Sequence, residues 1–224
     1  MQPTYLPWAG YFGLLDYVDV FVFLDDVQFQ KSSWQTRNRI LFNGQEHLLT
    51  VPTRNMSLST LISDVEIDHR KPWKKKHWKT LTAAYKNAPY AKEVLDLLEP
   101  VYSQNIDLNL SELNISIITR IQNFLGINTE TVLASEIGCG GTRSDHIIEI
   151  CNSLGCTKYV SPPSAKDYLS EDQFEMRGDV ELSFYSYLPQ EYRQLKTDDF
   201  VSHLSIVDVI ANLGLNESKH YIAS

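Results

Sequence analysis

Two different spacings of apolar residues follow one another near the start of this chain. Apolar residues recur at helical spacing over residues 8–17, after a bend that Pro3 and Pro7 stiffen by fixing their own φ angles. Residues 20–24 then form a short continuous run of β-branched and aromatic side chains, which is typical of a strand buried on both faces. The pattern predicts a bend, a helix and a buried strand.

A β-hairpin is predicted next. Two apolar segments, residues 39–42 and 47–51, flank Asn43-Gly44, the dipeptide that most favours a two-residue type I′ turn. One more short alternating strand is expected over residues 61–67.

Helical spacing dominates the middle of the chain. One helix is expected to begin at Pro72, and two more cover residues 89–99 and 108–124. The first of them is rich in lysine. Its charged face either gathers phosphate groups or is a solvated surface whose lysine stems cover neighbouring tryptophans.

The last third returns to alternating strands and helices. The elements expected there are strands over residues 131–133, 157–160 and 182–187, and helices over residues 144–154, 163–169 and 203–214. We therefore predict an α/β fold, with a mostly parallel Rossmann-like sheet, an edge hairpin and an inserted helical subdomain. Residues 1–69 and 128–224 would be the two α/β halves, residues 70–127 the insertion, and the whole one compact domain.

Composition narrows the class of protein. The 224 residues carry a formal net charge of −8, which argues against nonspecific nucleic-acid binding because that requires a basic surface. The sequence has no apolar run of membrane-spanning length and no leader-like segment. Three cysteines without paired spacing are expected to be buried, reduced thiols. A cytoplasmic protein without membrane contact is the expectation, and oligomerisation stays open.

Polar side chains that could take part in binding or catalysis gather near the N-terminus. Asp25 and Asp26 end the predicted strand, where open α/β sheets place their ligands, and Arg37 and Arg39 follow. The acids either hold Mg²⁺ beside a nucleotide or only cap the next turn. This order of groups predicts an anion or nucleotide site. The candidate binding residues here are Gln2, Tyr5, Trp8, Tyr11, Gln28, Lys31, Trp34, Arg37, Asn38 and Arg39.

A second polar and aromatic group lies near the C-terminus. Tyr187 and Tyr192 follow the last predicted strand, and Asp208 and Asn212 share one face of the final helix with Ser205. That stripe either makes internal hydrogen bonds or lines the pocket. The candidate general bases are Asp25 and His77. Histidine spacing matches no metal site, and the sequence identifies no cofactor.

The N-terminal segments QPTYLPWAGYF, DVFVFLDDVQF and KSSWQTRNRI resemble the WbqC-like family of bacterial proteins. The resemblance continues through LTVP, the segment from Trp73 to His77, Tyr85 with the Ala88-Pro89-Tyr90 step, and LSIVDVIANLG. It implies a role in O-antigen or related surface-polysaccharide biosynthesis, with glycyl or other aminoacyl transfer to a nucleotide-linked amino sugar as one reaction. The alternatives are a nucleotidylyltransferase-like or ATP-dependent ligase activity and a non-catalytic assembly protein of the same pathway.

Overall fold

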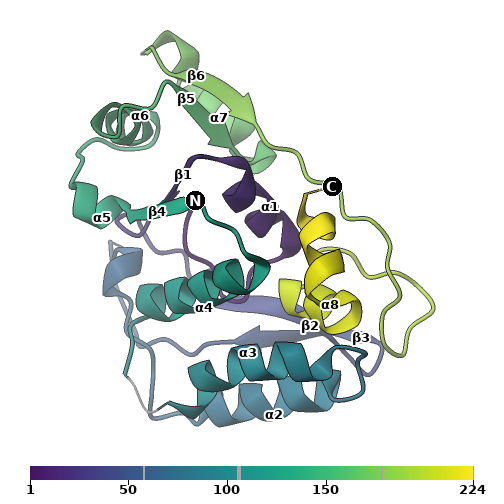
Figure 1. The fold of residues 1–224 in the computed structure, drawn as a ribbon. Coiled ribbons are helices and arrows are strands. Elements are labelled where there is room, and N and C mark those ends of the chain that lie inside the picture. The colour runs from purple at the N-terminus through teal and green to yellow at the C-terminus, as the bar shows by residue number, and fades with distance from the viewer. Residues whose placement is uncertain (58, 105–106, 178, 224) are drawn as a thin grey trace.

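The computed structural model describes residues 1–57, 59–104, 107–177 and 179–223 as a mixed α/β fold (Figure 1). The helices are α1 (Ala9–Tyr17), α2 (Trp73–Tyr85), α3 (Ala91–Ser103), α4 (Leu110–Leu125), α5 (Ala134–Ile137), α6 (Ser144–Ser153), α7 (Lys166–Glu171) and α8 (Ile206–Ile222). Three 3-10 turns are η1 (Ile62–Asp64), η2 (Pro163–Ala165) and η3 (Phe174–Met176). The strands are β1 (Val20–Phe23), β2 (Arg37–Phe42), β3 (Gln45–Thr50), β4 (Glu130–Leu133), β5 (Lys158–Ser161) and β6 (Glu181–Phe184).

The predicted hairpin is confirmed. Strands β2 and β3 pair antiparallel, with Phe42 opposite Gln45, so that only two residues form the loop. Asn43 and Gly44 have φ angles of 52° and 76°. Positive φ at both loop positions defines the type I′ turn that matches the twist of the flanking strands.

The strand predicted over residues 61–67 is wrong. Ile62–Asp64 is a 3-10 turn, and the bridges of Gln28 with Leu61 and of Thr53 with Ile67 are isolated ones outside the named strands. Ile62 and Val65 are both buried. Their spacing of three residues suits a 3-10 turn, in which residues i and i+3 eclipse, better than the two-residue period of a strand.

The strands form three separate pairs instead of one sheet. Strand β1 pairs with β4 and β5 with β6, both parallel, whereas β2 and β3 form the hairpin. The mixed α/β class is therefore confirmed, but a single Rossmann-like sheet is not. Among the described strands, no ladder joins β1 to β5, which would have to be linked in such a sheet.

Two hydrophobic clusters stabilise the fold. The larger one joins α1, β1 and the hairpin to α2, α3, α4 and α8. The smaller one lies within residues 147–180, where α6 and α7 pack on β5 and β6. Figure 1 shows this C-terminal unit at one end of the molecule and α2 and α3 at the other. The division into two halves and an insertion stays a prediction.

Local signals fix the ends of two long helices. Asn109 and Glu112 form a reciprocal capping box at the start of α4, an arrangement that contributes about 1 kcal/mol. Helix α8 begins at Ile206, three residues later than predicted, because Ser205 is its N-cap and accepts a hydrogen bond from Val207 N. It continues to Ile222 across a kink at Gly214, whose φ is 73°.

Candidate functional site

A pocket of about 500 Å³ opens between the N-terminal bend and the carboxyl ends of β5 and β6. Parallel strands present their following loops at this end, which is where α/β proteins usually bind ligands. The pocket lies beside the start of α1. Its lining residues are Met1, Thr4, Trp8, Gly10, Tyr11, Leu14, Trp34, Asn38, Arg39, Pro162, Pro163, Ser164, Tyr185, Ser186, Tyr187 and His203.

Two buried asparagines hold the N-terminal bend in place. The amide Nδ2 of Asn38 donates to the carbonyl oxygens of Tyr5 (3.2 Å) and Leu6 (2.8 Å). Asn114 Nδ2, from α4, donates to the carbonyl oxygens of Pro3 (3.1 Å) and Gln35 (2.8 Å). These bonds satisfy carbonyl groups of a segment that has no regular secondary structure, so the bend is fixed before any ligand binds.

Gln2 and Tyr11 also help to hold the N-terminal bend in place. Gln35 Nε2 donates to Gln2 Oε1 at 2.8 Å, and the Tyr11 hydroxyl donates to the carbonyl oxygen of Gln2 at 3.3 Å. Tyr11 lines the pocket and Gln2 does not. Gln2 thus ties the bend to the loop that leads into β2.

The indole of Trp8 lies directly over Gly10. A Cβ atom at Gly10 would come within 2.4 Å of the indole ring. The missing side chain therefore makes room for Trp8 itself, and not for close approach of a ligand to the helix. Trp8 is the N-cap residue of α1 and has no side-chain cap hydrogen bond.

Trp8 is part of an aromatic wall. Its ring stacks on the imidazole of His203, with centroids 4.9 Å apart, and meets Tyr187 edge-on at 5.3 Å. Tyr187 is buried and its hydroxyl donates to the carbonyl oxygen of Tyr221 at 2.9 Å. His203 is exposed and lines the pocket, and its Nδ1 lies 2.9 Å from the Ser202 hydroxyl.

Arg39 supplies a guanidinium to the pocket. Its Nη1 donates to the Glu46 carboxylate at 2.9 Å and its Nη2 to the carbonyl oxygen of His203 at 3.3 Å. The buried Nε has no hydrogen-bond partner within the described part of the chain. The guanidinium also lies 5.6 Å from the ring centre of Trp34, whose side chain is 50% exposed. A cation beside an exposed aromatic ring suits a ligand that has both an anionic group and a flat ring.

The other predicted residues of this region lie outside the pocket lining. Arg37 precedes Arg39 on β2 and is half-buried, Lys31 is exposed, and Gln28 is exposed in its bridge with Leu61. Of the two arginines expected from the sequence to bind a ligand, Arg39 thus lines the pocket and Arg37 does not.

Tyr5 and His77 meet in a separate buried cluster. The Tyr5 hydroxyl lies 2.8 Å from His77 Nδ1 and 2.6 Å from the Tyr102 hydroxyl. Burial lowers the pKa of His77 to about 4, so the imidazole is neutral at physiological pH. Burial also raises the pKa of Tyr5 well above its ordinary value. Neither side chain opens onto the pocket.

The two strand-end aspartates have partners within the fold. Asp25 accepts hydrogen bonds from the backbone nitrogen (3.0 Å) and hydroxyl (2.7 Å) of Ser135, in the first turn of α5. Asp26 contacts His146 Nε2 at 3.2 Å. These partners of the two side chains thus lie far along the chain, in α5 and α6, and not in the turn that directly follows β1. Among the described residues no group of three or more His, Cys, Asp or Glu side chains is placed to hold a metal ion.

The polar stripe of α8 makes internal hydrogen bonds. The carboxylate of Asp208 accepts from the Tyr192 hydroxyl (2.7 Å), from Gln194 Nε2 (3.3 Å) and from Asn212 Nδ2 (3.3 Å). Burial raises the pKa of Asp208 above its ordinary range, although these donors oppose the shift. Tyr192, Asp208 and Asn212 lie behind the aromatic wall and do not line the pocket.

The pocket therefore unites six of the predicted residues. They are Trp8, Tyr11, Trp34, Asn38, Arg39 and Tyr187. Sequence reasoning missed His203 and the segments 162–164 and 185–186, which complete the wall. Pro162 and Pro163 directly after a predicted parallel strand were a usable signal, because loops at that end of a sheet face the ligand.

No described helix is both long enough and apolar enough to cross a lipid bilayer. No solved structure shows a significant match to this chain. The chain is 32% identical to "Uncharacterized protein Rv1507c" of Mycobacterium tuberculosis (strain ATCC 25618 / H37Rv), over 99% of this chain and 95% of that protein. A sequence profile described as the WbqC-like protein family matches residues 2–220. The chain therefore belongs to the WbqC-like protein family.

Proposed function

We propose that this pocket binds a nucleotide-linked amino sugar and that the protein forms an amide on it by acyl or aminoacyl transfer. The observation that carries the proposal is the placement of the Arg39 guanidinium beside Trp34, in a pocket that Trp8 and His203 also line with their stacked rings. An aromatic base or sugar ring suits the indoles, and a diphosphate suits the guanidinium. The volume of about 500 Å³ is in the range of small-molecule sites.

Arg39 would bind the anionic group without leaving its present contacts. Nη1 and Nη2 each carry two N–H groups. One on Nη1 is held by Glu46 and one on Nη2 by the His203 carbonyl, which leaves the second on each for a ligand, whereas Nε is buried. The ion pair with Glu46 orients the guanidinium, and 28% exposure of the Arg39 side chain leaves it open to a ligand. A preoriented donor loses less entropy on binding than a free arginine would.

His203 is the proton acceptor that we propose for amide formation. The amino group of the sugar attacks the acyl carbon of a donor, a C–N bond forms, the bond to the leaving group breaks, and the imidazole takes the proton from nitrogen. His203 lines the pocket and is exposed, whereas Asp25 caps α5 and His77 lies in a buried cluster. Asp25 and His77 are therefore proposed as supporting residues. Positioning of the two reactants contributes much of the rate in such a reaction.

The assignment to surface-glycan biosynthesis rests on the resemblance of the N-terminal segments to proteins of those gene clusters. A pocket that is lined by aromatic rings and carries the cationic guanidinium of Arg39 is compatible with the nucleotide sugars that such pathways use. The sugar and the acyl donor are to be found by screening.

A ligand screen with matched variants tests the proposal. UDP- and dTDP-linked amino sugars are titrated into the wild-type protein, with thermal unfolding and calorimetry as readouts. A ligand present at 100 times its dissociation constant should stabilise the fold by about 2.7 kcal/mol. Arg39→Ala should abolish this stabilisation, and Arg54→Ala, which removes another surface arginine in an ion pair with Glu66, should retain it. Equal stabilisation of both variants would exclude Arg39 from the site.

Nucleotidyl transfer is a second candidate. The start of α1 is next to the pocket and Trp8, its N-cap residue, makes no side-chain cap hydrogen bond, so a phosphate would suit the positive end of this helix. Release of pyrophosphate from a nucleoside triphosphate and a sugar phosphate would favour this reaction over amide formation. Absence of any stabilisation by nucleotides or nucleotide sugars would instead favour a non-catalytic assembly protein.

A further inference from the structure

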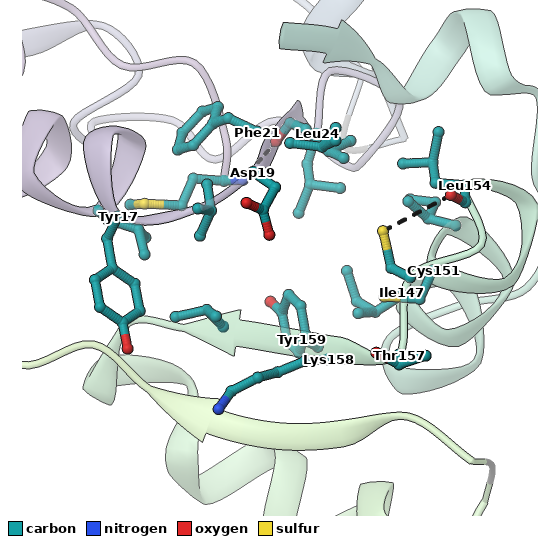
Figure 2. A pocket seen from close by; sticks show the side chains of 18 of the residues that line it. Tyr17, Asp19, Phe21, Leu24, Ile147, Cys151, Leu154, Thr157, Lys158 and Tyr159 are labelled. Atoms are coloured by element: carbon teal, nitrogen blue, oxygen red, sulfur yellow. Dashed lines mark hydrogen bonds between the residues drawn. The ribbon is translucent and has the colours of Figure 1, made fainter. Parts of the chain in front are cut away.

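A second cavity, of about 480 Å³, lies between β1 and β5 (Figure 2). Its lining includes the segment that joins α6 to β5. Two of the three cysteines of the chain, Cys151 and Cys156, line it, and Cys139 does not. Figure 2 shows Cys151 and Leu154 at the end of the cavity opposite to Tyr17. Two thiols therefore border one and the same space.

The expectation that all three cysteines are buried is wrong for two of them. Cys151 is buried, whereas Cys139 and Cys156 are half-buried, and each carries a free thiol. The Cys139 sulfur lies 3.3 Å from the Ser153 hydroxyl, and the Cys156 sulfur lies 4.0 Å from the carbonyl oxygen of Leu154. A dashed line in Figure 2 marks the second contact. Of the two thiols at the cavity, solvent thus reaches Cys156 more easily.

The C-terminus of α6 places these two cysteines next to each other. Cys156 N donates to the carbonyl oxygen of Cys151 at 2.8 Å, and Gly155 N donates to that of Asn152 at 3.1 Å. Gly155 has a φ of 66°. Together these features define the Schellman motif, in which the residues at the positions of Cys151 and Cys156 often bring their side chains into contact. Apolar side chains usually make that contact, and here both positions hold a thiol.

This arrangement suits a covalent bond between the two sulfurs. A disulfide needs Cα atoms about 4.4–6.8 Å apart, and residues joined by a backbone hydrogen bond commonly have that separation. Electrostatics indicate the same proximity, because burial raises the pKa of Cys151 to about 11 and the neighbouring Cys156 adds to the rise. Both side chains also belong to the smaller hydrophobic cluster, Cys151 as a buried member and Cys156 packed against it.

We propose that Cys151 and Cys156 are a modification site that closes to a disulfide by exchange with a low-molecular-weight disulfide, such as oxidised glutathione. Cys156, the more exposed thiol, loses its proton and attacks one sulfur of the small disulfide. An S–S bond to Cys156 forms, and one half of the small molecule leaves and takes up a proton. Cys151 then loses its proton and attacks the Cys156 sulfur, which releases the second half. Two protein thiols have lost two electrons, and one small disulfide has become two thiols.

The new bond would fix the turn between α6 and β5. The folded chain already holds both residues in this turn, so the disulfide restricts mainly the unfolded chain and should stabilise the fold. Strand β5 begins at Lys158, directly after the turn, and its other end leads to Pro162 and Pro163 of the ligand pocket. The inference does not depend on which ligand that pocket binds or on the reaction proposed above.

Equilibration of the full chain in glutathione buffers of stepped redox ratio tests the proposal. Free thiols are then blocked by alkylation and the protein is cut with trypsin, which releases residues 144–158 as one peptide with both cysteines and residues 121–143 as a peptide with Cys139. We expect the oxidised peptide 144–158 to be two hydrogen atoms lighter than the reduced one. The equilibrium constant for closure should be about tenfold or more larger in the folded protein than in concentrated urea, because the turn holds the pair together.

A matched pair of variants accompanies the measurement. Cys156→Ser should remove both the loss of two hydrogen atoms and the rise in unfolding temperature that oxidation causes in the wild type. Cys139→Ser replaces the half-buried thiol outside the cavity and should retain both effects. The peptide masses of the wild type decide the question even where a variant folds poorly.

Three results would overturn the proposal. One is an equal or smaller closure constant in the folded protein than in urea. The second is a disulfide that joins peptide 121–143 to peptide 144–158, since Cys139 would then be the partner. The third is a peptide 144–158 that stays reduced, or retains one bound glutathione, in the most oxidising buffer.

Discussion

The imidazole of His203 stacks on the indole of Trp8, with the two ring planes inclined by 29°. The backbone holds this pair together, because Trp8 and Ser205 form an isolated antiparallel bridge and Ile206 N donates to the carbonyl oxygen of Pro7. The stack thus joins the bend at the start of the chain to the N-terminus of α8. Both rings line the ligand pocket.

Replacement of Trp8 by alanine should weaken ligand binding. The substitution removes the platform on which a ligand ring would stack, and stacking on an aromatic side chain contributes about 1–3 kcal/mol. We expect the dissociation constant measured by calorimetry to rise by about tenfold or more. Trp8→Phe should retain part of the affinity. Trp78→Phe, which alters a tryptophan stacked on Tyr102 away from the pocket, is the control and should bind as the wild type does.

Gly10→Ala should disturb the pocket more than the fold. An added Cβ would lie 2.4 Å from the Trp8 ring, so the indole must move, whereas the helix itself tolerates alanine well. Ligand affinity is expected to fall while the unfolding temperature changes little. Gly140→Ala is the matched control, because the nearest atom to its added Cβ would be a Glu149 oxygen at 3.5 Å, an ordinary contact distance. An unchanged dissociation constant for Gly10→Ala would show that Trp8 does not need its present position.

Asn38→Ala should destabilise the whole protein. The change leaves the carbonyl oxygens of Tyr5 and Leu6 without their amide donor and the N–H of Arg39 without its acceptor. Unsatisfied buried polar groups cost about 1–3 kcal/mol each, and partial relaxation suggests a total loss of about 2–4 kcal/mol in the free energy of unfolding. Urea denaturation measures this loss in the free energy of unfolding. Exposed Asn123→Ala should stay within about 0.5 kcal/mol, and a similarly small change at Asn38 would contradict the support that we assign to it.

The pKa of His77 predicts a loss of stability in acid. The imidazole has a pKa of about 4 in the fold and about 6.5 in the unfolded chain, so the unfolded state binds a proton first as the pH falls. The contribution of His77 is fully present above pH 6.5 and is lost progressively down to pH 4. The free energy of unfolding should drop by about 3 kcal/mol across that window.

His77→Gln provides the comparison. Glutamine does not titrate, so its stability curve should be flatter than that of the wild type between pH 6.5 and 4. The Met1 amino group, with its lowered pKa, acts in the same direction below pH 8 in both proteins and cancels in the difference. Parallel curves for the two proteins would show that His77 is not buried as a neutral ring.

Local patterns in the sequence were sufficient for most elements. The Asn43-Gly44 turn, the apolar run of β1 and the capping residues of α4 each have a physical cause within a few residues. The predicted strand over residues 61–67 failed because two readings of its apolar spacing compete, and contacts with Asp25 and Val27 favour the 3-10 turn. Such contacts are not visible in local spacing.

The pocket was predictable only in part, for a similar reason. The density of aromatic and polar groups near the N-terminus predicted Trp8, Trp34 and Arg39 as ligand-binding residues; all three line the pocket, and their role in binding stays a prediction. The same chemistry at Tyr5, His77 and Asp208 serves internal hydrogen bonds instead, and residue type alone does not distinguish the two uses. His203 was missed because its pairing with Trp8 depends on how α8 docks.

The bond between Arg39 and the carbonyl oxygen of His203 joins residues 164 positions apart in the chain. When the ribosome has synthesised the bend, the hairpin and β6, His203 is therefore still missing, and the pocket lacks one of its walls. Nascent chains would remain unable to capture ligand until His203 and the start of α8 have been made. Ligand binding would thus report that α8 has docked against the N-terminal bend.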